Sequence, residues 1–426
     1  MTKPGDRVKI ITSEQDITGI LMPEEKEFIV LKMDTGYNIG IDKKRVREIS
    51  LLSHPSKKET EIPKAQPKPG LPKISILHTG GTIASKVDYS TGGVVAQFEP
   101  EKILEMFPEL REIANIDSRL ICNIMSENIR FGHYNIIAHE IKKEIEKGAE
   151  GIIITQGTDT IHYTGAALSF MLSDLGIPVI IVGAQRSSDR GSSDAALNLL
   201  SAALFITASK SFSGVAVCMH ETEEDTTCLI LPGTKCRKMH SSRRDAFKPI
   251  NSEPWARIDF KKRKVDYMRT DFIKRSAKIP EIREFKENLE IGILKTYPNM
   301  FADAVLAFKK YDGLIIEGTG LGHAPIMEID SLTKEHTKIY SAIKELIDND
   351  TIVALTTQTI YGEINMNVYS PGRKLLDIGI LGNYSDMTTE TAFIKLAWLL
   401  SNYPKHKVCE MFSKNLTGEI SKRLER

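Results

Sequence analysis

Two threonine-rich turns hold the residue types best suited to chemistry in this chain of 426 residues. Thr155-Gln156-Gly157-Thr158-Asp159-Thr160 follows an apolar run at 151–154, and His78-Thr79-Gly80-Gly81-Thr82-Ile83-Ala84-Ser85 follows another at 74–77. Short apolar runs bounded by glycine are typical of buried strands, and ligands of α/β sheets bind at the carboxyl ends of strands. Two hydroxyl-rich turns at one sheet edge therefore predict nucleophilic attack by threonine on a small polar substrate.

Thr82 is the predicted nucleophile of the first turn. The two glycines before it allow a sharp turn and a close approach of a substrate carbonyl, although a hydroxyl attacks only when a neighbouring group takes its proton. Threonine also commonly caps a helix, and Thr79 is a rival hydroxyl in the same turn. Spacing alone leaves the nucleophile and the helix cap open.

The order and spacing of three motifs resemble the L-asparaginase family. The motifs are TGGTIAS at 79–85, TQGTDT at 155–160, and Arg237-Lys238-Met239-His240-Ser241-Ser242. The resemblance covers about 350 residues, from Lys73 onward. The chain is similar in particular to the D subunit of archaeal-type glutamyl-tRNA(Gln) amidotransferases, a branch that resembles an asparaginase with an added N-terminal β domain.

The resemblance implies a catalytic set of Thr82, Thr158, Asp159 and Lys238. Thr82, and not Thr79, aligns with the family's nucleophile. In the family, the matching lysine, aspartate and second threonine are hydrogen-bonded together, and the aspartate also holds the substrate's α-amino group. A lysine drawn toward a carboxylate and a hydroxyl can shuttle a proton once it is desolvated.

Two other interpretations remain open for this second group. Asp159-Thr160 falls where a helix is expected to begin, so it also fits a helix N-cap. Lys238 is flanked by other basic residues, so it also fits a solvated surface charge. Lys238 is preferred to Lys235 because Phe247 follows it by nine residues, which is the family's spacing.

Three further residues are expected to contact the substrate. Ser126 and Glu127 follow an expected strand at 122–125, and the resemblance implies a serine there for the α-carboxylate and a polar neighbour for the α-amino group. Glu127 replaces the glutamine of some secreted asparaginases, which leaves the preference for glutamine or asparagine open. Tyr89 matches a tyrosine on a mobile lid, and the glycine pair at 92–93 suits such a motion. An ordinary exposed loop tyrosine is the competing interpretation.

The pattern along the chain predicts an α/β protein of asparaginase-like, two-domain, parallel-sheet architecture with a small N-terminal β-barrel domain. Short alternating runs near the N-terminus are typical of small β domains, a Pro/Lys-rich stretch is typical of a linker, and apolar runs separated by helices predict covered parallel sheets. The expected parts are the β-barrel domain at 1–53, the linker at 54–72, the catalytic domain at 73–275, an interdomain connection at 276–290 and the C-terminal domain at 291–426.

The expected elements follow from the same pattern. Strands are expected at 74–78, 151–155, 178–183, 214–219, 291–295, 313–317 and 352–356. Helices are expected near 133–148, 160–174, 193–208, 335–348 and 389–402.

Composition narrows the function classes. The net charge of +1 gives no overall attraction to nucleic acid or membrane, and no run reaches the 18 apolar residues of a membrane span. The five cysteines are scattered without a Cys-x-x-Cys pair, which predicts reduced thiols and neither a zinc site nor a disulfide framework. The N-terminal residues lack a signal-peptide pattern. A cytoplasmic location is expected.

The resemblance implies a glutaminase that supplies ammonia to a partner. That partner, the transamidase and kinase known as the E subunit, would use ATP and Mg²⁺ to convert Glu-tRNA(Gln) to Gln-tRNA(Gln), with two copies of this chain as a homodimer core within a heterotetramer. This chain itself is expected to need no metal and no organic cofactor. A free-standing cytosolic L-asparaginase is the alternative, and it lacks a need for the N-terminal β domain. A non-enzymatic scaffold would not need all four catalytic residues.

Overall fold

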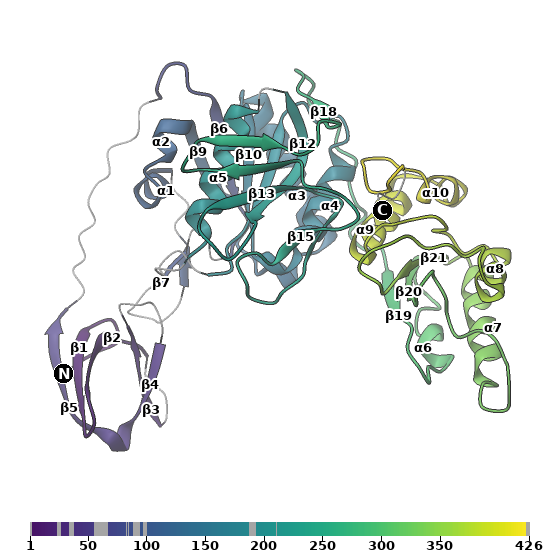
Figure 1. Ribbon diagram of the computed structural model, residues 1–426, viewed down its shortest axis with the longest axis horizontal. Helices are drawn as coiled ribbons and strands as arrows, with labels where there is room; N and C mark the ends of the chain where they lie inside the picture. The colour runs from purple at the N-terminus through teal and green to yellow at the C-terminus, as the bar shows by residue number, and fades with distance from the viewer. Residues whose placement is uncertain are drawn as a thin grey trace.

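The computed structural model describes residues 2–23, 27–33, 38–54, 67–81, 83, 85–87, 94–96, 100–186, 193–209 and 211–422. Thr82 and Tyr89 lie outside these residues, as does most of the predicted linker. Three larger sheets succeed one another along the chain: a small antiparallel sheet, a large mixed sheet covered by helices, and a small parallel sheet (Figure 1); two further sheets of the described residues are two-stranded. The predicted α/β fold with an N-terminal β domain is thereby confirmed.

The N-terminal sheet has its own small core. Its strands run in the order β4-β3-β2-β1-β5, with bounds β1 Arg7–Thr12, β2 Asp16–Leu21, β3 Phe28–Lys32, β4 Asn38–Asp42 and β5 Val46–Ser53. Alternate residues of β1 point inward, and the buried set is Val8, Ile10, Ile17, Leu31 and Ile41. The 3-10 helix η1 (Lys43–Arg45) leads into β5, whose residues are largely exposed.

The central sheet positions the catalytic turns. Its main strands, from one edge to the other, are β17 Lys264–Tyr267, β16 Ala256–Asp259, β13 Thr227–Pro232, β12 Phe212–His220, β11 Pro178–Val182, β10 Gly151–Thr155, β6 Lys73–His78 and β9 Asn115–Leu120. The pairs from β12 to β9 are parallel, and those from β12 to β17 are antiparallel. The short β18 (Ile273–Lys274) pairs with β12.

Both faces of this sheet are buried, which explains the continuous apolar runs. Ile152 and Ile154 lie in the core beneath α3 (Phe131–Glu146) and α4 (Ile161–Met171). Ile153, which alternates with them, lies in the opposite core with residues of α5. The helices of that second face are α1 Pro100–Met106, α2 Leu110–Ile113 and α5 Ala195–Ala208.

The expected strand at 122–125 is wrong. The strand in this region is β9, which pairs in parallel with β6 and ends at Leu120. Beyond it the chain runs as a loop, with Ile124 donating its backbone N–H to the Thr79 carbonyl, and then forms the 3-10 helix η2 (Ser126–Asn128). β9 is an edge strand with polar residues, so its sequence lacks the apolar run that marks its neighbours.

The end of the predicted linker packs on β9. Lys68 donates its backbone N–H to Asn115 Oδ1 at 2.8 Å, and Asn115 Nδ2 donates to the carbonyls of Lys68 and Leu71 at 3.0 and 2.9 Å. One asparagine side chain at the start of β9 therefore fixes the chain just before it enters β6.

The C-terminal part is a parallel sheet in the order β19-β20-β21 with helices around it. Its strands are β19 Ile291–Lys295, β20 Gly313–Gly318 and β21 Ile352–Thr357. Its helices are α6 Asp303–Leu306, α7 Glu335–Asp348, α8 Ser370–Asp377, α9 Thr389–Asn402 and α10 Lys405–Phe412.

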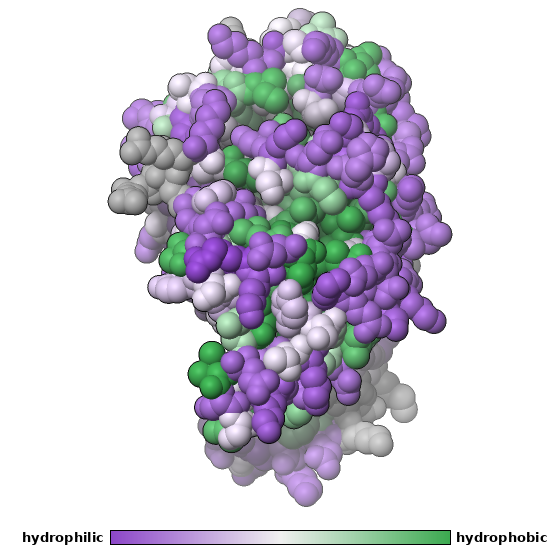
Figure 2. All heavy atoms as spheres, turned by 90° about the vertical axis from the view of Figure 1, so that its right-hand side faces the viewer, coloured by the Kyte–Doolittle hydropathy of each residue, from purple (hydrophilic) through white to green (hydrophobic). Residues whose placement is uncertain are grey.

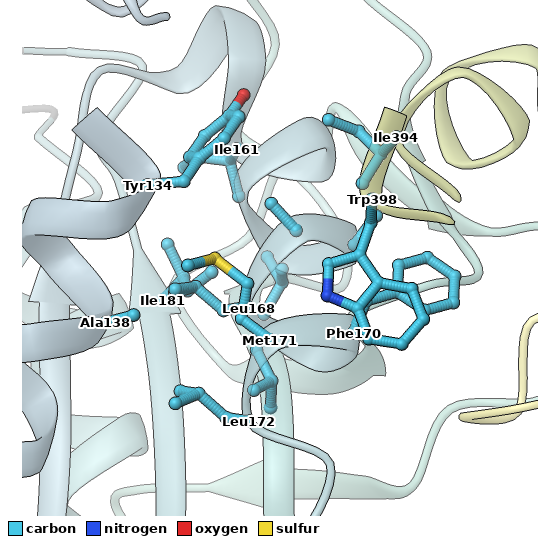
Figure 3. Packing of buried hydrophobic residues seen from close by; sticks show 14 of the residues in the cluster. Tyr134, Ala138, Ile161, Leu168, Phe170, Met171, Leu172, Ile181, Ile394 and Trp398 are labelled. Atoms are coloured by element: carbon cyan, nitrogen blue, oxygen red, sulfur yellow. The ribbon is translucent and has the colours of Figure 1, made fainter. Parts of the chain in front are cut away.

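Helix α9 joins the two large parts of the molecule. It packs on the C-terminal sheet and on α4 of the central sheet, where the rings of Trp398 and Phe170 stack with centroids 5.6 Å apart (Figure 3). The connecting segment also packs on this side, since Asn135 exchanges two hydrogen bonds of 2.9 Å with the backbone of Phe285.

The face formed by the C-terminal part is not uniformly polar. Apolar side chains gather in its middle and are surrounded by hydrophilic ones (Figure 2). Contiguous exposed apolar patches commonly mark surfaces that other molecules cover. Among the described residues, no helix has the length and apolar character to cross a membrane.

Candidate active site

The turns after β6 and β10 are in direct contact. The Thr79 backbone N–H donates to the Thr155 carbonyl at 3.0 Å, which extends the strand pairing into the turns. Gly81 has a φ of +83°, and a Cβ at that position would lie 2.6 Å from the backbone nitrogen of Gly157. Only glycine fits such a positive φ with so close a neighbour. The described residues of the two threonine-rich segments thus lie side by side.

Lys238 reaches this site from a separate hairpin. The hairpin consists of β14 (Cys236–Lys238) and β15 (Phe247–Pro249), with Lys238 directly opposite the buried Phe247. The nine-residue spacing in the sequence therefore arises because Lys238 and Phe247 pair across this hairpin. Lys238 Nζ lies 2.8 Å from Thr158 Oγ1 and 2.7 Å from Asp159 Oδ1.

Burial differs sharply between the two charges of this contact. The Lys238 side chain is 10% exposed and the Asp159 side chain is 66% exposed. The interpretation of Lys238 as a solvated surface charge is therefore wrong. One face of the Asp159 carboxylate stays open to solvent while Oδ1 accepts from Lys238.

The helix-cap interpretation of this turn holds for position only, because Thr160 is the N-cap residue of α4 but its side chain does not cap the helix. Residues 158–160 form the 3-10 helix η3 (Thr158–Thr160), and Thr160, the residue before α4, makes no side-chain cap hydrogen bond. Its hydroxyl instead donates to the Ser126 carbonyl at 2.8 Å. The polar side chains of the turn therefore serve contacts outside the helix.

The structure brings Ser126 beside the second turn. Ser126 is buried, and a Cβ on Gly157 would lie 3.0 Å from its Oγ. Glu127 follows on the same 3-10 helix and is exposed. Ser126 therefore lies next to the turn that holds Thr158 and Asp159, and Glu127 follows it in the chain.

Gln185 is a site residue that the sequence reasoning missed. Thr158 Oγ1 donates to Gln185 Oε1 over 3.5 Å, and the Gln185 backbone N–H donates to Asp194 Oδ2 at 3.0 Å. The available signal was position, because Gln185 follows the apolar strand β11 as the threonine turns follow β6 and β10.

Lys235 points away from the threonine turns. Its Nζ lies 2.5 Å from Asp386 Oδ2 and 2.9 Å from Ser421 Oγ, both in the C-terminal part. Of the two candidate lysines, Lys238 is the one that contacts Thr158 and Asp159.

Two buried histidines lie under the site. The ring of His78 bridges Thr155 Oγ1 at 2.6 Å and Ser118 Oγ at 2.8 Å, and burial lowers its pKa to about 3. Burial likewise lowers the pKa of His162, in the first turn of α4, to about 4. Both imidazoles are neutral at physiological pH. His78 orients two hydroxyls, and His162 packs against the rings of Tyr163 and Phe247, in both cases without adding charge.

The arrangement suits proton transfer at a hydroxyl beside an anionic anchor. Lys238 can exchange a proton with Thr158, and the open side of Asp159 can pair with a substrate cation. In the described parts of the chain, no group of three or more His, Cys, Asp or Glu side chains is placed to hold a metal ion.

Three family descriptions match successive parts of the chain. Residues 73–272 match "Asparaginase, N-terminal", residues 290–412 match the glutaminase/asparaginase C-terminal domain, and residues 2–52 match the GatD N-terminal domain.

Curated relatives match over nearly their whole lengths. The glutamyl-tRNA(Gln) amidotransferase D subunit of Methanococcus maripaludis (strain C7) is 44% identical and covers 98% of both chains. The protein of the same name from Pyrococcus furiosus is 43% identical over 98% of this chain and 94% of its own. The solved thermostable L-asparaginase from Thermococcus kodakarensis aligns with a TM-score of 0.73 at 28% identity, over 82% of this chain and 100% of that one. L-asparaginase I from Vibrio cholerae aligns with a TM-score of 0.68 at 25% identity, over 82% and 99%.

Proposed function

The chain belongs to the family of glutamyl-tRNA(Gln) amidotransferase D subunits, and from this premise we propose that it hydrolyses glutamine and delivers the ammonia to its transamidase partner. The observation that carries the proposal is the contact of Lys238 with both Thr158 and Asp159, because it supplies a proton-transfer pair beside an open carboxylate. A hydroxyl nucleophile needs such a proton-transfer group to hydrolyse an amide.

The proposed reaction has two steps. Thr82 Oγ attacks the side-chain amide carbon of glutamine, its proton passes to the leaving nitrogen, and ammonia departs from a glutamyl ester of the enzyme. Water then attacks that ester, and glutamate leaves as Thr82 regains its proton. Thr158 and Lys238 relay protons in these steps, and Asp159 pairs with the substrate's α-ammonium group. The packing of Gly81 against Gly157 supports a shared site for the two threonine turns.

Substrate positioning completes the proposed site. We assign Ser126 to the α-carboxylate, Glu127 to the α-ammonium group with Asp159, and Tyr89 to a lid. The position of Ser126 beside Gly157 supports its assignment. We further propose that this chain uses no cofactor of its own, and that ATP and Mg²⁺ serve the partner's chemistry.

The N-terminal domain favours the amidotransferase over a free-standing asparaginase. The asparaginase structures align over their full lengths yet leave about a fifth of this chain unmatched, and residues 2–52 match the GatD N-terminal domain. We propose that the chain works in the cytoplasm with the transamidase and kinase E subunit and Glu-tRNA(Gln), as the homodimer core of a heterotetramer. The apolar centre of the face in Figure 2 supports an assembly that covers it.

Ammonia release tests the proposal directly. The rate is measured with glutamine and with asparagine, for the chain alone, with the partner, and with the partner and Glu-tRNA(Gln). The expected result is glutamine hydrolysis that rises with each addition, because a partner increases activity when it favours the competent state. A high rate that no addition changes, with asparagine preferred, would support the free asparaginase instead.

The nucleophile is tested in the same assembly. Thr82→Val removes the hydroxyl at nearly constant size and is expected to abolish glutamine-dependent amidation, while Thr82→Ser retains part of it. Added free ammonia should restore amidation in Thr82→Val, because the partner's chemistry is separate. Glutaminase activity of the folded Thr82→Val variant near that of the wild type would exclude Thr82 as the nucleophile.

A further inference from the structure

The short strand that carries Lys238 is held by the start of helix α9. Arg237, next to Lys238 on β14, pairs with Glu390, with its Nε 2.9 Å from Oε1. The carbonyl of Thr234, just before this strand, accepts a hydrogen bond of 2.9 Å from Thr391 Oγ1. Both partners lie in the first turn of α9.

A second ion pair, Lys235–Asp386, anchors the same hairpin. Lys235 and Asp386 are 2.5 Å apart, with side chains only 4% and 2% exposed. Asp386 also accepts the Ser421 backbone N–H at 3.0 Å, and its carbonyl accepts a hydrogen bond of 2.9 Å from Asn251, just after β15. Contacts from the C-terminal part therefore flank the hairpin at its beginning and its end.

Stability alone does not account for these buried charges. A buried ion pair often contributes little net stability, because desolvation offsets the attraction. Glu390 Oε2 is moreover buried without a hydrogen-bond partner among the described residues, which adds a cost. The Arg237–Glu390 and Lys235–Asp386 pairs are better explained by the hairpin that they hold in place.

Strand geometry links these pairs to the catalytic lysine. Neighbouring residues of a strand point to opposite faces, so a contact that fixes Arg237 on one face also fixes the direction of Lys238 on the other. Helix α9 is itself packed on α4 (Figure 3), and α4 directly follows the η3 turn that holds Thr158 and Asp159. Helix α9 thus contacts both the strand that carries Lys238 and the helix that follows Thr158 and Asp159.

We propose that Glu390 and Asp386 are positioning residues for the glutaminase reaction. Through Arg237 and Lys235 they form a latch between the C-terminal half and the β14–β15 hairpin, and this latch holds Lys238 against Thr158. The chemical consequence of the latch rests on the proposed function, whereas its structural consequence, an immobilised hairpin, does not.

The test compares single and double variants of one pair in the full-length chain assembled with its partner. Glu390→Gln, Arg237→Gln and the double variant are assayed for glutamine hydrolysis. Each is expected to lower kcat about 10- to 100-fold with KM nearly unchanged, because misplacement of a catalytic group lowers turnover more than binding. The double variant is expected to lose no more than either single variant, since all three break the same contact.

A matched ion pair serves as the control. Glu144 pairs with Arg119 at 3.0 Å with side-chain exposures of 1% and 34%, which resemble the 9% and 30% of Glu390 and Arg237. Glu144→Gln makes the same chemical change on α3, away from the hairpin, and is expected to lower the melting temperature without lowering kcat. Each assay is run well below the melting temperature of its variant.

Hydrogen exchange supplies a readout that does not depend on activity. A peptide spanning residues 234–247 is expected to exchange faster in Glu390→Gln than in the wild type, while peptides from β10 stay unchanged. The proposal is overturned if kcat in Glu390→Gln falls no more than in Glu144→Gln, or if exchange in this peptide is unchanged. Lys238→Met separates the two proposals, since an active Lys238→Met enzyme would overturn the role of Lys238 itself.

Discussion

At the scale of single residues, three positions separate two lysines with different tasks. Lys238 meets Thr158 and Asp159 at the edge of the site, whereas Lys235 is enclosed with Asp386. The two lysines lie in one short segment. Lys238 faces the proposed substrate site, whereas Lys235 faces the C-terminal part of the chain.

Exchanging each lysine for methionine should therefore show which lysine acts mainly on turnover and which acts mainly on stability. Lys238→Met is expected to lower kcat at least about 100-fold with little change in unfolding free energy, because it removes a proton relay. Lys235→Met is expected to lower the unfolding free energy by about 3 kcal/mol or more, because it leaves Asp386 buried without its cation, and to lower kcat less than Lys238→Met does, because it loosens the latch without removing the relay. Turnover and urea unfolding of both variants check this. A reversed pattern would contradict the assignment of Lys238.

The two buried histidines predict how stability depends on pH. Their pKa values are lowered by burial to about 3 for His78 and about 4 for His162. The unfolded chain therefore binds more protons below its ordinary histidine pKa of about 6.5. Their contribution to stability is complete above that pH and is lost as the pH falls toward about 4, by up to about 1.4 kcal/mol per pH unit for each histidine.

Urea unfolding between pH 7 and pH 4 measures this slope. His162→Phe, which keeps an aromatic ring next to Phe247, should give a shallower slope than the wild type because one titrating group is gone. Equal slopes in the two proteins would show that His162 does not contribute.

At the scale of elements, the site depends on how closely the strand ends pack. A Cβ on Gly183, just after β11, would lie 2.7 Å from Thr158 Cγ2. Gly183→Ala is therefore expected to displace Thr158 from Lys238 and to lower kcat about tenfold or more. Gly151→Ala, at the opposite end of β10, would meet Ile206 Cγ2 at 2.2 Å and serves as the control. It should lower the melting temperature while leaving kcat unchanged, and a similar loss of kcat in both would contradict the prediction.

Sequence reasoning found the elements whose residues are buried on both faces. The apolar runs that became β6, β10, β11 and β12 predict strands because helices cover both sides of them. β9 and the antiparallel strands β13, β16 and β17 were missed. β9 lies at the edge and carries polar residues such as Ser118, which binds His78, so its pattern resembles a loop. Local pattern cannot distinguish such an edge strand from the segment at 122–125.

The candidate site was predictable only in part, for a different reason. Thr158, Asp159 and Lys238 belong to motifs with a fixed order, and the structure brings them together. Gln185 and Glu390 lie outside the three motifs, and Arg237, although it begins the motif that contains Lys238, has no role that the motif implies. Glu390 is linked to Arg237 across about 150 residues, and no spacing along the chain predicts such a contact.

At the scale of the whole molecule, the N-terminal sheet has a core separate from the three other hydrophobic cores. Removal of residues 1–66 is expected to leave a folded α/β enzyme, and it keeps Lys68 and Leu71 on Asn115. Intrinsic glutamine hydrolysis should be nearly unchanged, while its stimulation by the partner and Glu-tRNA(Gln) should weaken. Ammonia release with and without these additions measures the effect. Equal stimulation in the full and shortened chains would reduce the β domain to a stabilising role.

The latch also bears on when the enzyme becomes competent during its synthesis. Lys235 precedes Asp386 by 151 residues. At ribosomal speeds of about 5–20 residues per second, roughly 8 to 30 seconds pass between them, while the N-terminal parts of a nascent chain already fold. During that interval the threonine turns exist without the helix that fixes Lys238. From the proposed latch we expect unfinished chains to be poor glutaminases, so that glutamine hydrolysis begins only after α9 has been made.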